Sequence, residues 1–277
     1  MMHSKTSITI FYSILMLFVC SNICSQKVQK FARLSDFQLA KPQIIYDQIL
    51  FESENEIFLL LDHPDVEIRY TLDGSNPTSN SNLYSGPIKI KQSTHLKALA
   101  THPEYQKSET AEMKFIQLNK KISAKSIQMD REPHQNYPGS GPGSLMDLQK
   151  GTTNFRTSHW MGFDGGDLVV TIELAEKMKV NKVISSLISD PGAWIFLPAE
   201  ILVYLSKNGK KYKLAGRKAL DQSTPESTSG LEFISTDFKT RNSKFIQLQI
   251  KSMSAIPDWH QGKGTAPWLF IDEIIIE

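Results

Sequence analysis

The residues best suited to chemistry in this chain of 277 residues are four tryptophans and the polar side chains beside them. Three of them, Trp160, Trp194 and Trp259, lie next to segments typical of loops. An exposed indole offers a flat apolar face to the C–H face of a sugar, and neighbouring polar groups can hydrogen-bond its hydroxyls. We therefore expect a ligand site built from Arg156, His159, Trp160, Asp190, Trp194, Trp259, His260 and Lys263.

A packing role is the alternative for each tryptophan, because large apolar side chains usually fill the core of a β-sandwich. Trp194 and Trp268 abut apolar runs, which favours the core for both. Trp259 lies between Pro257-Asp258 and the segment 261–264, which contains two glycines, so it is the strongest expected ligand contact. His260 gains a binding role from its position beside Trp259.

The sequence lacks the motifs of a zinc site, a phosphate-binding loop or a serine nucleophile, and we predict no catalytic residue. The seven histidines lack the paired spacing of a zinc site. The chain also lacks a phosphate-binding loop and a Gly-x-Ser-x-Gly motif. Asp272-Glu273 is an adjacent acidic pair in a strand-like run, where neighbouring side chains point to opposite faces. Two such carboxylates cannot jointly flank a glycosidic bond, so hydrolysis is not expected.

The N-terminus is typical of an export signal. Lys5 precedes an apolar run over Ile8–Val19, which is shorter than the roughly 20 residues of a membrane-spanning helix. We expect a signal peptide over residues 1–25 and a secreted, periplasmic or cell-surface location, with no membrane span. Cys20 and Cys24 are the only cysteines, and lipid modification of either is the less favoured alternative to cleavage after Ser25.

Composition indicates an ordinary globular protein with 40% apolar and 22% charged residues. The formal net charge of +2 gives no electrostatic reason to expect a nucleic-acid partner. Short strand-like runs follow one another without long helical periodicity, which predicts an all-β fold of two sandwiches. These runs are 57–61, 66–72, 89–100, 112–118, 167–174, 180–188, 200–206, 244–251 and 269–277.

The runs and the turn residues between them define the expected domains. A lead-in over 26–39 precedes a first sandwich at 40–118, in which Asp73-Gly74 marks a turn. A polar linker is expected at 119–135, followed by a second sandwich at 136–277. Asn208-Gly209 predicts a tight turn inside this second unit.

The first unit resembles the immunoglobulin-like (fibronectin-like) module found after the catalytic domain of chitobiases and β-hexosaminidases. The matching segments are Ile68–Thr78, with the sequence IRYTLDGSNPT, and Leu83–Ile88, with the sequence LYSGPI. The resemblance covers about 80 residues and implies a spacer or packing role. The catalytic barrel of that family needs about 250 residues and has no room in this chain.

The second unit resembles an F5/8 type C domain, the discoidin or galactose-binding-like jelly roll found at the C-terminus of bacterial family 20 hexosaminidases. The matching segments are Trp160–Leu168, Trp194–Pro198, Ser206–Lys210, Pro257–His260 and Trp268–Ile274. The resemblance implies a structural calcium ion held by Asp147, Thr152 and Glu273, with carbonyl oxygens completing its shell. Asp147 is followed by Leu148, where the family usually has glycine.

These observations favour an exported, non-catalytic carbohydrate-binding protein. The resemblances imply a glycan containing GlcNAc or galactose as its ligand. One alternative is a protein–protein or assembly module, because fold alone does not imply sugar binding. Another is an accessory part of a β-N-acetylhexosaminidase system, acting with a separate glycoside hydrolase or surface protein.

Overall fold

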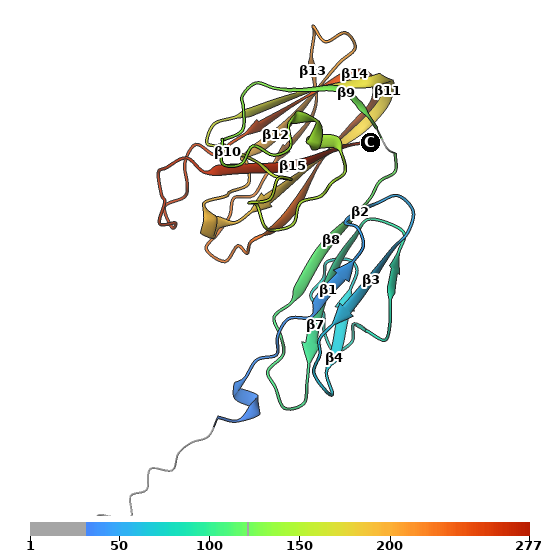
Figure 1. Cartoon of the computed structure of the whole chain (residues 1–277), viewed down its shortest axis with the longest axis vertical. Coiled ribbons are helices and arrows are strands. Elements are labelled where there is room, and N and C mark those ends of the chain that lie inside the picture. The colour runs from blue at the N-terminus through green and yellow to red at the C-terminus, as the bar shows by residue number, and fades with distance from the viewer. Residues whose placement is uncertain (1–31, 121) are drawn as a thin grey trace, which may run out of the picture.

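The computed structural model describes residues 32–120 and 122–277, and strands dominate it (Figure 1). The expected all-β class of two successive sandwiches is confirmed. The expected signal peptide and both cysteines lie outside the described residues. Among those described, no helix has the length and apolar character needed to cross a bilayer. Residues 32–120 and 122–277 contain three short 3-10 helices, η1 (Leu34–Asp36), η2 (Pro142–Met146) and η3 (Pro191–Ala193).

The first sandwich pairs a three-stranded sheet with a five-stranded sheet. The smaller sheet has the order β1 (Gln43–Tyr46), β3 (Asn55–Leu60), β6 (Ile88–Ile90). The larger has the order β2 (Leu50–Phe51), β8 (Ala111–Gln117), β7 (Thr94–Thr101), β4 (Glu67–Thr71), β5 (Asn82–Leu83). Strand β3 alternates buried and exposed residues, so Ile57 and Leu59 enter the core while Phe58 and Leu60 face outward. After β4, Gly74 has a φ of +82°, the left-handed conformation expected for this turn.

The second sandwich is larger and depends on two strands of 22 residues each, β11 and β14. Its strands are β9 (Ala124–Met129), β10 (Met161–Asp164), β11 (Leu168–Ser189), β12 (Glu200–Ser206), β13 (Lys213–Ala219), β14 (Gly230–Lys251) and β15 (Trp268–Ile276). The first half of β11 pairs with β9 and with the end of β14, whereas its second half pairs with β15 and with the start of β14. Register shifts between residues 173 and 182 divide the two halves. Both long strands therefore contribute to both layers, which enclose one apolar core.

Strand β9 lies in the segment 119–135, where the sequence predicts a linker. Residues 124–129 instead pair antiparallel with Leu174–Val170 of β11. The strand is polar because it lies at the margin of the sheet, and only Ile127, Ala124 and Met129 pack toward the core. Its sequence thus resembles a loop although its backbone completes the sheet.

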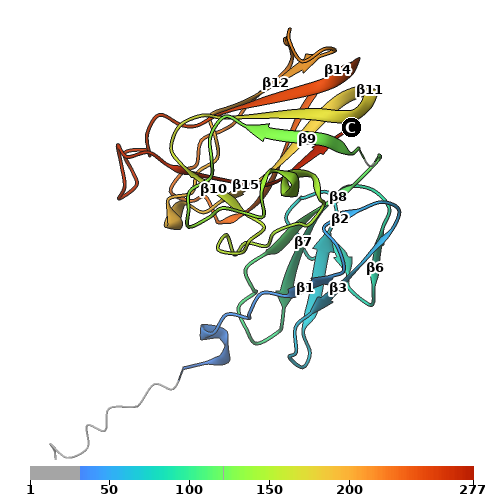
Figure 2. The same ribbon diagram turned by 45° about the horizontal axis from the view of Figure 1, so that its top comes forward.

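The first sandwich lies against one side of the second (Figure 2), and an apolar cluster joins them. Ile49, Leu50 and Leu118 of the first unit meet Ile184 and Ile275 of the second, and all five are buried. A salt bridge of 2.6 Å between Lys114 on β8 and Glu232 on β14 crosses the same interface. The cluster and the ion pair therefore hold the second sandwich against the end of the first.

Candidate carbohydrate-binding site

Two tryptophans are exposed at one end of the second sandwich. Trp194 follows helix η3 and retains 37% exposure, and Trp259 lies in the loop before β15 and retains 39%. Both rings pack edge-on against the imidazole of His260, with centroid separations of 6.0 Å for Trp194 and 5.5 Å for Trp259. We call Trp194 and Trp259 the aromatic platform.

His260 fastens together the two loops that carry the aromatic platform. Its Nδ1 accepts a hydrogen bond of 3.0 Å from the backbone N–H of Gly262, so the ring proton is on Nε2. Nε2 then donates to the carbonyl oxygen of Pro191 at 2.9 Å. The Gly262 backbone also passes directly beneath the indole of Trp194, where a Cβ atom would lie 3.2 Å from the ring. Both nitrogens of His260 are therefore engaged within the protein.

The backbone at Trp194 is held in an uncommon conformation. Its φ of +65° and ψ of +22° lie in the left-handed region, which a bulky residue rarely adopts. Asp190 and Ile195 close the loop by exchanging backbone hydrogen bonds of 2.9 and 3.0 Å. The Asp190 carboxylate accepts a further bond of 2.8 Å from the hydroxyl of Ser229. This turn projects the indole outward, and such strain is concentrated at binding sites.

Two predicted ligand contacts are buried, and the structure corrects them. Trp160 has no exposed surface because it packs with Phe155 and Phe270, and its Nε1 donates to the carbonyl of Thr152 at 2.9 Å. His260 is only 9% exposed, and its ring contacts both indoles of the aromatic platform. Neither side chain can lie against a ligand in this arrangement. Trp268 packs beside the same cluster as Trp160, as its apolar neighbours indicate.

The remaining predicted contacts differ in their relation to the platform. Lys263 is exposed in the loop of Trp259, and its backbone N–H donates to the carbonyl of His260 at 3.0 Å. Arg156 and His159 are exposed on the neighbouring loop. The Arg156 guanidinium lies 4.5 Å above the ring of Phe155, and His159 Nδ1 lies 3.3 Å from the Thr157 hydroxyl. The structure thus brings Asp190, Lys263 and the aromatic platform onto connected loops. The contacts of Arg156 and His159 lie within their own loop instead.

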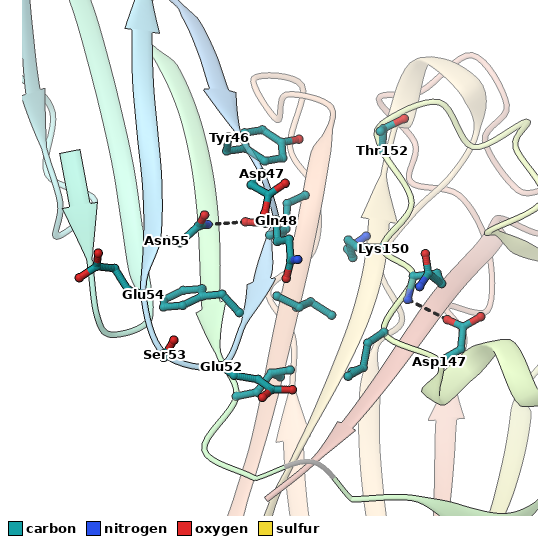
Figure 3. Close-up of a pocket in the computed structure, with 16 residues that line it drawn as sticks. Tyr46, Asp47, Gln48, Glu52, Ser53, Glu54, Asn55, Asp147, Lys150 and Thr152 are labelled. Carbon is teal, nitrogen blue, oxygen red and sulfur yellow. Dashed lines mark hydrogen bonds between the residues drawn. The ribbon is translucent and has the colours of Figure 1, made fainter. Parts of the chain in front are cut away.

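The three residues expected to hold calcium are only partly brought together. Asp147 is exposed, and its Oδ1 accepts the backbone N–H of Gln149 at 2.8 Å (Figure 3). Thr152 is exposed, and its hydroxyl accepts the N–H of Asn154 at 3.2 Å. Glu273 is fully buried, and neither carboxylate oxygen has a hydrogen-bond partner within the described chain. Calcium needs six to eight oxygen ligands, so as arranged here these side chains do not form its shell.

The cation buried at this place is the ammonium group of Lys150. Its Nζ lies 2.6 Å from Oδ2 of Asp272, donates to the carbonyl of Gly151 at 3.0 Å, and stands 4.5 Å above the ring of Trp160. The two side chains are 5% and 0% exposed. Burial lowers the pKa of Lys150 and raises that of Asp272, and the ion pair opposes both shifts. Lys150 was not singled out from the sequence, where it is one lysine in a polar loop.

Asp272 and Glu273 do not follow the alternation expected of strand neighbours. Ser186 pairs with Glu273 whereas Leu187 pairs with Ile271, which leaves Asp272 as an extra residue in a β-bulge. Both carboxyl groups are therefore buried near Lys150. Burial, followed by the charges of Asp272 and Asp147, raises the pKa of Glu273 to about 9. The sequence argument that these two carboxylates point to opposite faces is therefore wrong. Their burial is what keeps them from flanking a glycosidic bond.

A cleft of about 700 Å³ separates the loop of Lys150 from the first sandwich (Figure 3). The segment 46–55 lines one side and the segment 147–152 lines the other. Figure 3 shows Asp47, Glu52 and Glu54 on the side of the first unit. The cleft therefore lies at the interface between the sandwiches, on elements other than those that carry the aromatic platform.

Comparison with known proteins supports the resemblance drawn for the first unit. Residues 50–112 match the family model of the chitobiase/beta-hexosaminidase C-terminal domain. No curated protein sequence matches the chain significantly. A solved CBM32 from Clostridium perfringens, in complex with GalNAc-beta-1,3-galactose, is 13% identical with a TM-score of 0.37, and the match covers 55% of this chain and 93% of that one.

Two further solved structures match a similar share of the chain. The CBM32 of AlyQ, in complex with 4,5-unsaturated mannuronic acid, is 12% identical with a TM-score of 0.38 and covers 57% of this chain and 98% of that one. The C-terminal domain of a chitobiase from Bacteroides fragilis is 14% identical with a TM-score of 0.33, covering 57% and 93%. Residues 50–112 of this chain are therefore similar to the chitobiase/beta-hexosaminidase C-terminal domain, and the three solved structures match slightly more than half of the chain.

Proposed function

We propose that this chain is an exported, non-catalytic carbohydrate-binding protein whose aromatic platform holds a glycan. The observation that carries the proposal is the exposure of two indoles on loops that a buried histidine fastens together. Full burial of a large apolar side chain contributes about 1.5–3 kcal/mol, and these residues, at 37% and 39% exposure, forgo part of it. Two partly exposed indoles that both contact His260 are therefore better explained by a ligand than by packing.

The chemistry of the platform suits the C–H face of a pyranose. Each indole supplies an apolar face, and the exposed residues Asp258, Gln261 and Lys263 in the loop of Trp259 supply hydrogen-bonding groups for ring hydroxyls. Because the loops are already held by His260, little ordering is needed on binding. A single shallow site of this kind binds weakly, and clustering of ligands or of protein copies raises the overall affinity.

Glycans containing GlcNAc or galactose are the ligands we propose to test first. A separate glycoside hydrolase or surface protein is the partner that we propose, and the match of residues 50–112 to a hexosaminidase accessory domain supports the hydrolase. The apolar run Ile8–Val19 supports export. Fractionation of cells that express the full chain, or a variant with polar substitutions in this run, tests export independently of binding.

A glycan array tests the binding function. The purified chain should bind a subset of glycans, and the double variant Trp194→Ala/Trp259→Ala should lose at least tenfold in affinity. Leu214→Ala is the matched control, because Leu214 is also an exposed apolar side chain of the second sandwich, at 48% exposure, and lies on β13. A folded protein that binds no glycan, or a double variant that binds like the control, would overturn the proposal and favour the assembly-module alternative.

A further inference from the structure

A second pocket lies at the opposite end of the second sandwich. Strand β12 begins after the loop of Trp194, and the pocket opens where β12 ends. Its volume is about 490 Å³, within the usual range of about 300–1,000 Å³ for small-molecule sites. The residues that line it come from the end of β12, the β12–β13 turn, the start of β13 and β14, and they include Lys207, Asn208, Lys211, Lys213, Arg241 and Asn242.

The residues that line this pocket carry only positive charge. Lys207, Lys211, Lys213 and Arg241 all face this pocket, and none of its lining residues is acidic. Within the described chain these four cations make no salt bridge, in contrast to Lys150, Lys114 and Lys182, which are each paired at 2.6 Å. A hollow lined by unpaired charge of one sign concentrates the electric field and attracts counter-ions.

The turn that presents these cations is fixed by its own hydrogen bonds. The Asn208 side chain accepts the backbone N–H groups of Lys210 and Lys211 at 3.1 and 3.3 Å. The Ser206 hydroxyl accepts the N–H of Gly209 at 3.0 Å, and Gly209 has the left-handed φ of +72° that the turn requires. The lysines therefore extend from an ordered backbone, which lowers the entropic cost of binding an anion.

We propose that this pocket binds the anionic group of an acidic polysaccharide, a uronic-acid carboxylate or a sulfate ester. The volume suits one or two sugar rings, and the amide of Asn242 adds a group that can bond a hydroxyl. The cations are gathered in one pocket on a chain of net charge +2, which differs from the extended basic surface that a nucleic-acid backbone needs. This site is separate from the aromatic platform, so it adds a second ligand class to the proposed function.

Binding to three polymers tests this inference. Polygalacturonate supplies carboxylates, dextran sulfate supplies sulfate esters, and dextran is the neutral control. The purified chain should bind one of the two polyanions, and Lys207→Ala/Lys211→Ala should weaken that binding at least tenfold and reduce its salt dependence. The matched control is Lys107→Ala/Lys218→Ala, which removes the same charge at exposed lysines outside the pocket.

The outcomes separate this site from the aromatic platform. Trp194→Ala/Trp259→Ala should leave polyanion binding unchanged, both if the array shows glycan binding and if it shows none. Equal weakening by both double-lysine variants would overturn the inference, because the attraction would then belong to the whole surface. Tighter binding to duplex DNA, lost in the Lys207→Ala/Lys211→Ala variant, would assign the pocket to nucleic acid and would also overturn it.

Discussion

The buried ion pair of Lys150 and Asp272 makes a quantitative prediction about stability. Lys150→Met keeps most of the aliphatic stem but removes the ammonium group that lies 2.6 Å from Asp272. The remaining carboxylate is fully buried, and removing one partner of such a pair costs about 3–5 kcal/mol. Replacing both partners, in Lys150→Met/Asp272→Leu, should recover much of this loss because no buried charge is then left unpaired.

Urea unfolding followed by tryptophan fluorescence measures this loss selectively. All four tryptophans belong to the second sandwich, so the signal reports the unit that contains the ion pair. Lys218→Met, at an exposed lysine of β13, is the matched control and should change the free energy of unfolding by less than about 0.5 kcal/mol. A loss below about 1 kcal/mol for Lys150→Met would refute the argument that this ammonium balances the buried carboxylates.

Three further predictions follow from the loops around this ion pair and the aromatic platform. The pKa of Glu273 is about 9 in the folded chain, against an ordinary value of 4.5, so the folded state retains a proton that the unfolded state has lost between these pH values. Stability should therefore fall as pH rises through this window, and urea midpoints for Glu273→Gln should fall less steeply; an equal slope would contradict this. Because Lys150 supplies the buried cation, calcium or a chelator should leave the unfolding temperature unchanged, and a rise with calcium would show that a metal shell forms. His260→Ala removes the hydrogen bond to Pro191, which joins the two platform loops, and the bond to Gly262, which lies within the loop of Trp259. It should cost about 1–3 kcal/mol while speeding amide exchange at Gly262; unchanged exchange would argue against its role in holding the loops.

Local sequence patterns predicted the strands of both cores because their residues alternate or form apolar runs. Ile57 and Leu59 follow this rule in β3, and the turns at Gly74 and Gly209 have the left-handed backbone that their sequences indicate. The predicted runs omit β9, the first half of β14, and the strands β1, β2, β5, β10 and β13. Strand β9 and the first half of β14 are largely polar and owe their conformation to pairing with β11. Such pairing is a long-range interaction that no local pattern records.

The site was predictable only in part because burial depends on distant neighbours. Trp259 is exposed, as its loop residues indicate, whereas Trp160 lies in a similar loop but is covered by Phe155 and Phe270. Asp272 and Glu273 occupy a strand, but the bulge that turns both inward arises from pairing with β11. Nothing in the local sequence distinguishes the buried Lys150 from the exposed lysines of other loops.

The central claim is that a glycan lies on Trp194 and Trp259, and the indole N–H signals of the four tryptophans in a nitrogen-15 NMR spectrum test it directly. Titration with the best ligand from the array should shift the signals of Trp194 and Trp259. It should leave that of Trp160 in place, because this indole is buried and bonded to Thr152. Binding that shifts neither exposed indole, or that moves Trp160 equally, would contradict the account.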